Sequence, residues 1–232
     1  MYNRIIAMAA VLALAACAAP RPPPATAPRA APAGSSLQAL PAPGNYEIDS
    51  GGSELRLLVY RAGPLSRLGH NHVMVNHAVS GHVQIGDAIS STSFSLSIPA
   101  SAFIVDDTQS RSEEGGDFPG EIPEDAKEGT RRNMLGAAVL NAAQYPEISV
   151  TCVSLAGSLG SMTADVDVGA AGHRSRLTVP LTLQGDSRHF VAAGSLEVKQ
   201  TALGLAPYSL MGGALQVQDA MQLKFTITVL TN

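Results

Sequence analysis

The sequence predicts a mainly β protein whose antiparallel strands form a sandwich or a closed barrel. Apolar and polar residues alternate with a period of two in run after run between residues 46 and 230. Several such runs within about 190 residues are typical of a sandwich or barrel. The alternation is interrupted once, between residues 106 and 146, where the pattern indicates a single helical insertion.

The clearest alternation occupies residues 215–230, where apolar side chains alternate with Gln, Lys and Thr. Such runs indicate antiparallel strands that are wetted on one side only. Closing the sheet into a barrel would turn every apolar face inward. We expect the lumen to be lined by Leu57, Val59, Val73, Val75, Phe94, Leu96, Ile98, Val150, Leu177, Val179, Leu181, Leu223, Phe225 and Ile227.

The size of the inward residues bears on whether a barrel would be packed or hollow. Most are mid-sized aliphatic residues, and Ala164, Ala192 and Gly194 are small. A small barrel fills itself with side chains, whereas a slightly wider one leaves a ligand cavity. Small inward residues favour the hollow form.

The insertion combines loop and helix signals. Pro123 followed by Glu124 and Asp125 is typical of a first helical turn. We expect a helix over residues 123–142, with a break near Gly136 as an alternative, lying across one barrel end or against its wall. Nine of the nineteen acidic residues lie between positions 106 and 128. Their spacing matches no EF-hand, so a solvated acidic lid is favoured over a Ca²⁺ loop.

The N-terminal residues lie outside the predicted fold. Arg4 precedes an apolar run of 12 residues at positions 5–16, which is too short to span a bilayer but suits a secretory signal. The run ends Leu-Ala-Ala-Cys at Cys17, which resembles a bacterial lipoprotein signal whose cysteine is lipidated. An ordinary secretory signal is the alternative. We therefore expect an exported protein, on the periplasmic face of the outer membrane or in the periplasm.

Residues 18–43 contain eight of the fifteen prolines and form a predicted Pro/Ala linker that cannot bury a core. At about 3.1 Å per residue the linker could reach at most about 80 Å. The predicted organisation is thus a signal at 1–17, a linker at 18–43 and a folded domain at 44–232. Cys152 would then have no disulfide partner, and we expect it to be a buried, unreactive thiol.

Composition excludes several function classes. The net charge is −4 and Trp is absent, so neither a basic patch nor a base-stacking surface is expected, and no nucleic-acid partner. No Gly-x-Ser-x-Gly, phosphate loop or Cys pair is present. We expect the protein not to be an enzyme, with no certain cofactor.

Histidines concentrate in the stretch "GHNHVMVNH" at 69–77. If this stretch is a strand, His70 and His72 lie on one face of it and Val73 and Val75 lie on the other. With the valines facing inward, the histidines would point outward or lie at the barrel rim. Local hydrogen bonding is the favoured interpretation. The alternatives are polar contacts to a ligand head group, such as a quinone carbonyl, and a half site for Zn²⁺ or Cu²⁺. A third metal ligand would come from His82, His173 or an acidic residue of the insertion.

Four segments, in order, resemble the YceI-like family. They are "YEIDSGG" from Tyr46, "VSGHVQI" around Gly81, "RRNMLGAAVLNAAQYPEI" from Arg131, and a closing segment with Gly204, Leu205, Val217, Asp219 and Met221. The resemblance covers residues 46–230. It departs from the family pattern at positions 200–204, which read Gln-Thr-Ala-Leu-Gly.

The resemblance implies an antiparallel, lipocalin-like β-barrel with an apolar lumen. Some family members bind a polyisoprenoid chain or an isoprenoid quinone. We therefore expect an exported, lipid-anchored barrel that carries or sequesters such a ligand. The alternatives are a periplasmic metal-binding or redox-accessory protein that uses His70 and His72, and a structural envelope lipoprotein with a packed barrel.

Overall fold

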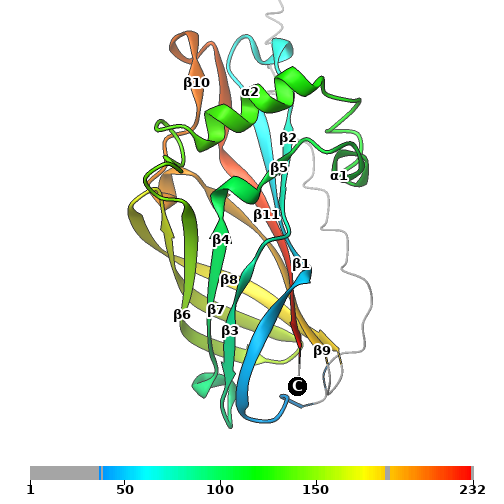
Figure 1. Cartoon of the computed structure of the whole chain (residues 1–232), viewed down its shortest axis with the longest axis vertical. Helices are drawn as coiled ribbons and strands as arrows, with labels where there is room; N and C mark the ends of the chain where they lie inside the picture. The colour runs from blue at the N-terminus through cyan, green and yellow to red at the C-terminus, as the bar shows by residue number, and fades with distance from the viewer. Residues whose placement is uncertain (1–36, 38, 186–188, 231–232) are drawn as a thin grey trace, which may run out of the picture.

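A closed antiparallel barrel forms the body of the protein in the computed structural model, which describes residues 37, 39–185 and 189–230 (Figure 1). Eight strands of an 11-stranded sheet close the barrel, because β11 pairs with β1. The barrel strands are β1 (Gly44–Ala62), β3 (Ser80–Ile85), β4 (Ser93–Pro99), β6 (Glu147–Ser158), β7 (Ser161–Ala170), β8 (His173–Gly185), β9 (His189–Lys199) and β11 (Leu215–Leu230). The prediction of a mainly β, lipocalin-like barrel is confirmed.

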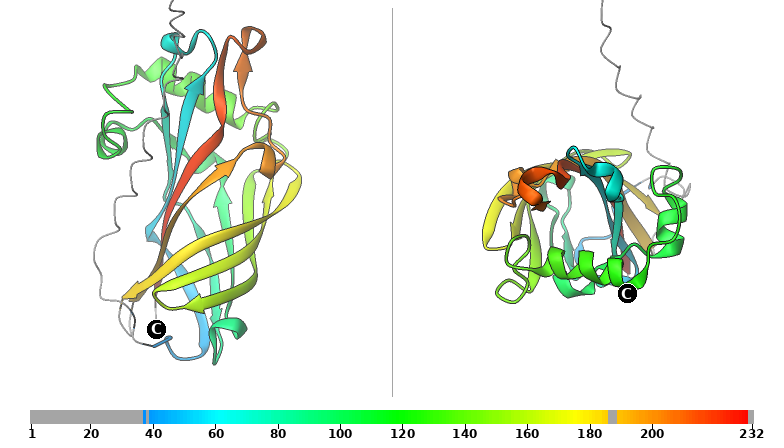
Figure 2. Two further views of the ribbon diagram at one scale, coloured as in Figure 1. Left: turned by 180° about the vertical axis from the view of Figure 1, so that it is seen from behind. Right: turned by 90° about the horizontal axis from the view of Figure 1, so that it is seen from above.

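Strand β1 has different partners along its length. Its lower half pairs with β3, with Tyr46 opposite Val83, and its upper half pairs with β2 (His72–Asn76), with Leu57 opposite Met74. Strand β5 (Ile104–Val105) adds to the free edge of β2. The upper part of this wall therefore consists of the upper half of β1 and the short strands β2 and β5, which are not among the eight strands that close the barrel. Helix α2 (Glu124–Leu135) lies across the upper end beside them (Figures 1 and 2).

The insertion contains two helices rather than one. Helix α1 (Thr108–Glu113), which was not expected, begins where the Asp107 side chain accepts a hydrogen bond from the Ser110 backbone N–H at 3.0 Å. Helix α2 ends at Leu135, so the prediction of a helix over 123–142 is wrong beyond that residue. The break falls at Gly136, whose extended backbone ends the helical hydrogen-bonding pattern. None of the described helices is both long and apolar enough to cross a membrane.

The expectation of a solvated acidic lid is wrong for two of its residues. Asp106 is fully buried and pairs with Arg111. The Glu114 side chain is 6% exposed and pairs with Arg56 and Lys224, which project from the barrel wall. Buried carboxylates persist because each has a cationic partner within hydrogen-bonding distance. The insertion is thus fastened to the barrel by ion pairs.

Apolar residues are buried on both sides of the upper wall. The main cluster fills the barrel, and a second cluster of Leu58, Val73, Val75 and Phe118 lies outside it. The prediction that Val73 and Val75 point into the lumen is wrong, because they pack outward under Phe118. The inward face of β2 carries His72 and Met74 instead. The insertion covers the outer face, so that face is apolar as well.

The end of the predicted linker also differs from expectation. Strand β1 begins at Gly44, but Leu37 and Leu40 are already partly buried against the main cluster at the base of the barrel. The expectation that no residue before 44 packs on the core is therefore wrong for these two leucines. Positions 1–36, with the predicted signal, Cys17 and most of the linker, lie outside the described residues. Cys152 is half-buried against the main cluster, and burial raises its pKa.

A candidate ligand cavity with a polar mouth

The upper half of the barrel encloses a cavity of about 460 Å³. Its walls come from the inward faces of the strands and from one face of α2. The aliphatic part of the wall is contributed mainly by leucine, valine and methionine. Among these residues are Leu57, Val59, Met74, Val139, Leu140, Val198, Leu203, Leu205, Met221 and Leu223. A volume in this range is typical of a small-molecule binding site.

A second cavity of about 160 Å³ continues toward the base. The two cavities share part of their walls, namely Leu55, Ile98, Val150, Val168, Leu177 and Leu223. At the base, Leu40 and Pro41 complete the lower lining. Among the described residues, Thr92 is the one polar side chain that lines the lower cavity. The interior is therefore an apolar column that runs from the mouth toward the base.

Most residues predicted to line the lumen do so. Leu57 and Val59 line the upper cavity only, whereas Ile98, Val150, Leu177 and Leu223 line both. The lower cavity is also lined by Phe94, Leu96, Val179, Leu181, Phe225 and Ile227. Val73 and Val75 line neither cavity. Ala164 and Ala192 line the lower cavity, whereas Gly194 makes room for the Phe225 ring, which a Cβ at this position would approach within 2.6 Å.

Helix α2 supplies a cavity wall that sequence reasoning missed. Ala126, Gly129, Thr130, Asn133 and Met134 all line the upper cavity. Their spacing places them on one face of the helix. The signal was weak because, apart from Met134, the side chains on this face are small or polar and do not form the apolar stripe by which amphipathic helices are recognised.

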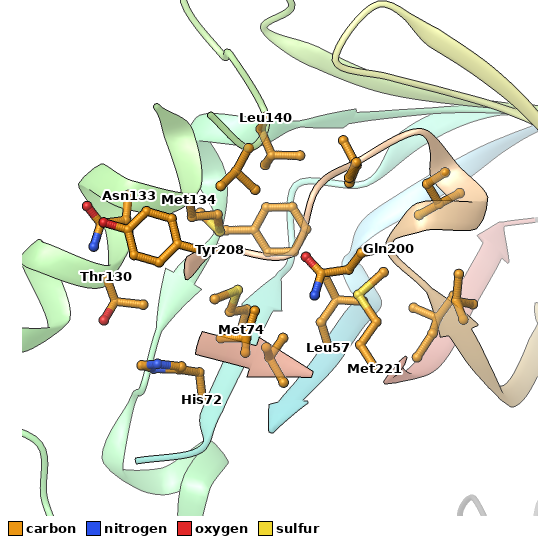
Figure 3. Close-up of a pocket in the computed structure, with 18 of the residues that line it drawn as sticks. Leu57, His72, Met74, Thr130, Asn133, Met134, Leu140, Gln200, Tyr208 and Met221 are labelled. Carbon is orange, nitrogen blue, oxygen red and sulfur yellow. The ribbon is translucent and has the colours of Figure 1, made fainter. Parts of the chain in front are cut away.

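Polar groups gather at the mouth of the upper cavity (Figure 3). Tyr208, Asn133 and Thr130 lie together on one side, and His72 lies below them. Gln200, which is 6% exposed, donates its amide to the Gln218 carbonyl oxygen at 2.8 Å. Polar side chains at one end of an apolar cavity can orient an amphipathic ligand.

The stretch that departs from the family pattern forms part of this rim. Asp219 accepts hydrogen bonds from the Thr201 backbone N–H at 2.9 Å and from the Thr201 hydroxyl at 2.7 Å. These bonds, the backbone one first, lower the pKa of Asp219. They hold the turn η4 (Thr201–Leu203), so that Gln200 and Leu203 face the cavity. Asp219 interrupts the apolar alternation because it anchors this turn.

The paired histidines meet a buried carboxylate. His72 Nδ1 lies 2.7 Å from Asp106 Oδ2, and His70 Nε2 lies 3.4 Å from the same oxygen. The two rings are in edge contact, with their centroids 4.5 Å apart. Both histidines line the upper cavity, so they lie at its mouth rather than pointing outward. His70 Nε2 is buried without a hydrogen-bond partner among the described residues.

Asp106 is held from several sides. Its Oδ1 accepts hydrogen bonds from the Val73 backbone N–H at 2.9 Å and from Arg111 at 2.7 Å. Burial alone would raise the pKa of Asp106, but contacts from His70, His72 and the Val73 N–H outweigh it and hold the pKa well below its usual value. Asp106 is therefore ionised at neutral pH.

Arg111 is itself almost fully buried, with 1% of its side chain exposed. Its other hydrogen bonds go to backbone carbonyl oxygens, at 2.7 Å for Asn71, 3.2 Å for Pro119 and 3.4 Å for Gly120. The guanidinium also stacks 5.9 Å from the centre of the Phe118 ring. Arg111 thus joins the histidine stretch to the insertion.

The remaining histidines do not join this cluster. His82 lies beside Ser95, with Nε2 3.2 Å from the hydroxyl oxygen. His173 packs against Gly204, and exposed His77 lies 3.3 Å from the Ser53 carbonyl oxygen. Of the third metal ligands considered from the sequence, only an acidic residue of the insertion, Asp106, is close enough.

The fold and the cavity together define a β-barrel of the binding-protein class. The family model for the YceI-like domain matches residues 46–229. The chain belongs to the YceI-like family, as its motifs indicated. No curated protein matches the sequence.

Solved structures share the barrel fold at low sequence identity. The crystal structure of BcnA from Burkholderia cenocepacia aligns with a TM-score of 0.58 and 15% identity, covering 78% of this chain and 98% of that one. A polyisoprenoid-binding domain from Saccharophagus degradans aligns with a TM-score of 0.54 and 13% identity, covering 81% and 98%. At these identities the similarity shows the fold alone.

Proposed function

We propose that the protein is a carrier or sequestering protein for one long apolar lipid, a polyisoprenoid or an isoprenoid quinone. The proposal rests on the apolar column inside the barrel. Polar side chains gather at the mouth of this column, whereas its lower part is almost entirely apolar. The same cavity disfavours the alternative of a packed, purely structural barrel. The polyisoprenoid-binding domain with the same fold supports this ligand class. The proposal includes no catalytic step.

The energetics define what the barrel must recognise. Transfer from water stabilises a bound lipid by about 0.8 kcal/mol per buried CH₂ group. A lipid that leaves a bilayer gains almost none of this, because its chain was already in hydrocarbon. Selection must therefore come from the shape of the column and from head-group contacts with residues such as Tyr208, Gln200 and His72.

The proposal places the protein outside the cytoplasm. Residues 1–17 would act as a lipoprotein signal, and Cys17 would carry the acyl chains that hold the mature protein in a membrane. The expected location is the periplasmic face of the outer membrane, or the periplasm if the signal is an ordinary secretory one. The support is the apolar run followed by the Leu-Ala-Ala-Cys stretch.

The proposal is tested by purifying the full chain without denaturants, extracting it with organic solvent and analysing the extract by mass spectrometry. We expect near-stoichiometric isoprenoid lipid in the wild type. Leu177 lines both cavities, so Leu177→Trp should fill the column and lower the lipid content at least about fivefold. Thr178→Trp, at the neighbouring outward position, is the matched control. A folded wild-type protein that contains no lipid and takes up none from vesicles would refute the proposal.

A second candidate function, transition-metal binding, is favoured by one observation. Ligand atoms of His70, His72 and Asp106 all lie within 4.8 Å of one another. Imidazole and carboxylate groups suit Zn²⁺ or Cu²⁺, and His70 Nε2, which makes no hydrogen bond among the described residues, lies 3.4 Å from Asp106 Oδ2. Arg111 opposes this function, because its charge lies against the carboxylate.

Calorimetric titration with Zn²⁺ and Cu²⁺ tests the metal site. If the site binds metal, the wild type and His82→Ala should bind one equivalent, and His72→Ala should bind at least about tenfold more weakly. His82 is the control because it lies beside Ser95, away from the cluster. Equal affinity in all three proteins, or no binding, would reject this function.

A further inference from the structure

Two loops at the cavity mouth expose large apolar side chains. In the β1–β2 loop, Leu68 is 78% exposed, and in the hairpin between β10 (Ser209–Leu210) and β11, Met211 is 76% exposed. These are the highest exposures among the large hydrophobic side chains that the structure describes. Leu65 and Leu210, at 36% and 44%, extend the same surface. We call residues 63–71 and 206–214 the mouth loops.

The mouth loops form one surface because a backbone hydrogen bond joins them. The Leu65 N–H donates to the Ala214 carbonyl oxygen at 2.8 Å. Gly63 has φ +89°, and a Cβ there would lie 2.6 Å from the same oxygen, so only glycine allows this approach. Leu68 and Leu210 also line the upper cavity, so the exposed surface continues into the apolar column. Figure 2 shows the two loops side by side at the upper end of the barrel.

The charges of the mouth loops are of one sign. Arg67 lies within the first loop and Arg61 lies two positions before it, and both are exposed. Neither loop contains an Asp or Glu, and residues 206–214 carry no charged side chain at all. Exposed apolar side chains flanked by arginines are complementary to an anionic lipid surface, which attracts the cations and accepts the apolar groups.

We propose that the mouth loops dock into an anionic bilayer, with Leu68 and Met211 entering the acyl region, so that lipid passes directly between membrane and cavity. This inference rests on the proposed lipid-carrier function and adds the route of exchange. An isoprenoid chain that moved through water would lose the hydrocarbon contacts of the bilayer before it gained those of the barrel. Docking removes that barrier.

The predicted tether is long enough for this orientation. The described chain enters at the base, where Leu40 lines the lower cavity, so the tether and the mouth are at opposite ends. Strand β11, which runs from mouth to base, has 16 residues and spans about 53 Å at roughly 3.3 Å per residue. Positions 18–36 of the predicted Pro/Ala linker precede Leu37, which already packs against the core, and these 19 residues could span up to about 59 Å. An anchor at Cys17 therefore leaves the mouth free to turn toward the same membrane.

Site-specific fluorescence tests the docking in the full, acylated chain. An environment-sensitive dye is attached at Leu68→Cys, Met211→Cys or Val153→Cys, each in a Cys152→Ser background. Val153 is the control because it is 46% exposed on the barrel wall, away from the mouth. In phosphatidylethanolamine–phosphatidylglycerol vesicles, acyl-chain quenchers should reduce emission at least about twofold at 68 and 211 but not at 153. Absence of quenching at 68 and 211 would overturn the proposal.

A transfer assay separates the docking proposal from the carrier proposal. Both the wild type and Met211→Glu should bind a fluorescent polyisoprenoid to the same extent at equilibrium, because Met211 does not line either cavity. Met211→Glu should extract it from the vesicles at least about tenfold more slowly, while Val153→Glu should match the wild type. Equal rates in all three proteins would refute docking. A wild type that binds no probe would refute the carrier function, whatever the quenching shows.

Discussion

His72 Nδ1 lies 2.7 Å from Asp106 Oδ2, although 34 positions separate the two residues in the chain. The contact joins the start of β2 to the residue that follows β5. Backbone bonds reinforce it, because the Asp106 N–H donates to the Val73 carbonyl oxygen at 2.7 Å. One carboxylate thus organises the histidine stretch, the buried Arg111 and the entry to the insertion.

Replacing Asp106 should strongly destabilise the protein. Asp106→Asn leaves the Arg111 guanidinium buried without a counter-charge. Breaking a buried ion pair by removing one partner costs about 3–5 kcal/mol. We expect a decrease of that size in the free energy of unfolding, measured by urea denaturation.

The double variant Asp106→Asn/Arg111→Met provides the control for this prediction. If the uncompensated charge is the cause, the second substitution should recover part of the lost stability. A single variant as stable as the wild type would show that the pair contributes nothing.

Neighbouring residues of β2 should respond differently to truncation. Val75→Ala removes methyl groups from the outer cluster and should lower the free energy of unfolding by about 2 kcal/mol with unchanged lipid content. Met74→Ala should also destabilise, but it enlarges the upper cavity and should alter which lipids are retained. Urea denaturation and mass spectrometry of extracts measure the two effects. Altered lipid content in Val75→Ala would contradict the assigned faces.

The turn at the cavity rim should make stability depend on pH through Asp219. Hydrogen bonds from Thr201 place the folded-state pKa of Asp219 below its unfolded-state value of about 3.9. The stabilisation is therefore fully present above about pH 4 and is lost as the pH falls through the folded-state pKa. The melting temperature of Asp219→Asn should lie below that of the wild type at pH 7. The difference should shrink as the pH falls below about 4, and a constant difference down to pH 2 would contradict this role.

Gly63 should be intolerant of a side chain. Gly63→Ala forces an L-residue into a positive φ and brings its Cβ against the Ala214 carbonyl oxygen. We expect a loss of about 1–3 kcal/mol in the free energy of unfolding. The mouth loops should also separate, measured as faster amide hydrogen exchange at Leu65. Gly116→Ala is the control, because a Cβ there meets no atom within 4 Å.

The period-two pattern was sufficient to predict the barrel and most of the residues that line its interior. It succeeded along β4, β8 and β11, where Phe94, Leu177 and Phe225 face the interior and polar residues occupy the opposite side. In such strands the local sequence is enough to identify the inward face, because only one face is apolar.

The same reasoning failed on β2. Both faces of that strand are buried, one against the cavity and one against Phe118, so the pattern could not tell which side faced inward. Met74 and Val75 are equally apolar, and the choice depends on a loop some forty positions later in the chain. The α2 wall escaped prediction for a related reason, because Gly129 and Thr130 line the cavity without being strongly hydrophobic.

The sequence by itself determined the mainly β fold, the apolar interior, the family and the presence of paired histidines. Each of these features depends on residues that are close together in the chain. Only the tertiary structure decided that Asp106 and Arg111 are buried beside those histidines and that two exposed loops meet at the mouth. The physical reason is that burial and charge pairing depend on segments far apart in the chain. Their mutual approach is set by barrel closure, not by any local pattern.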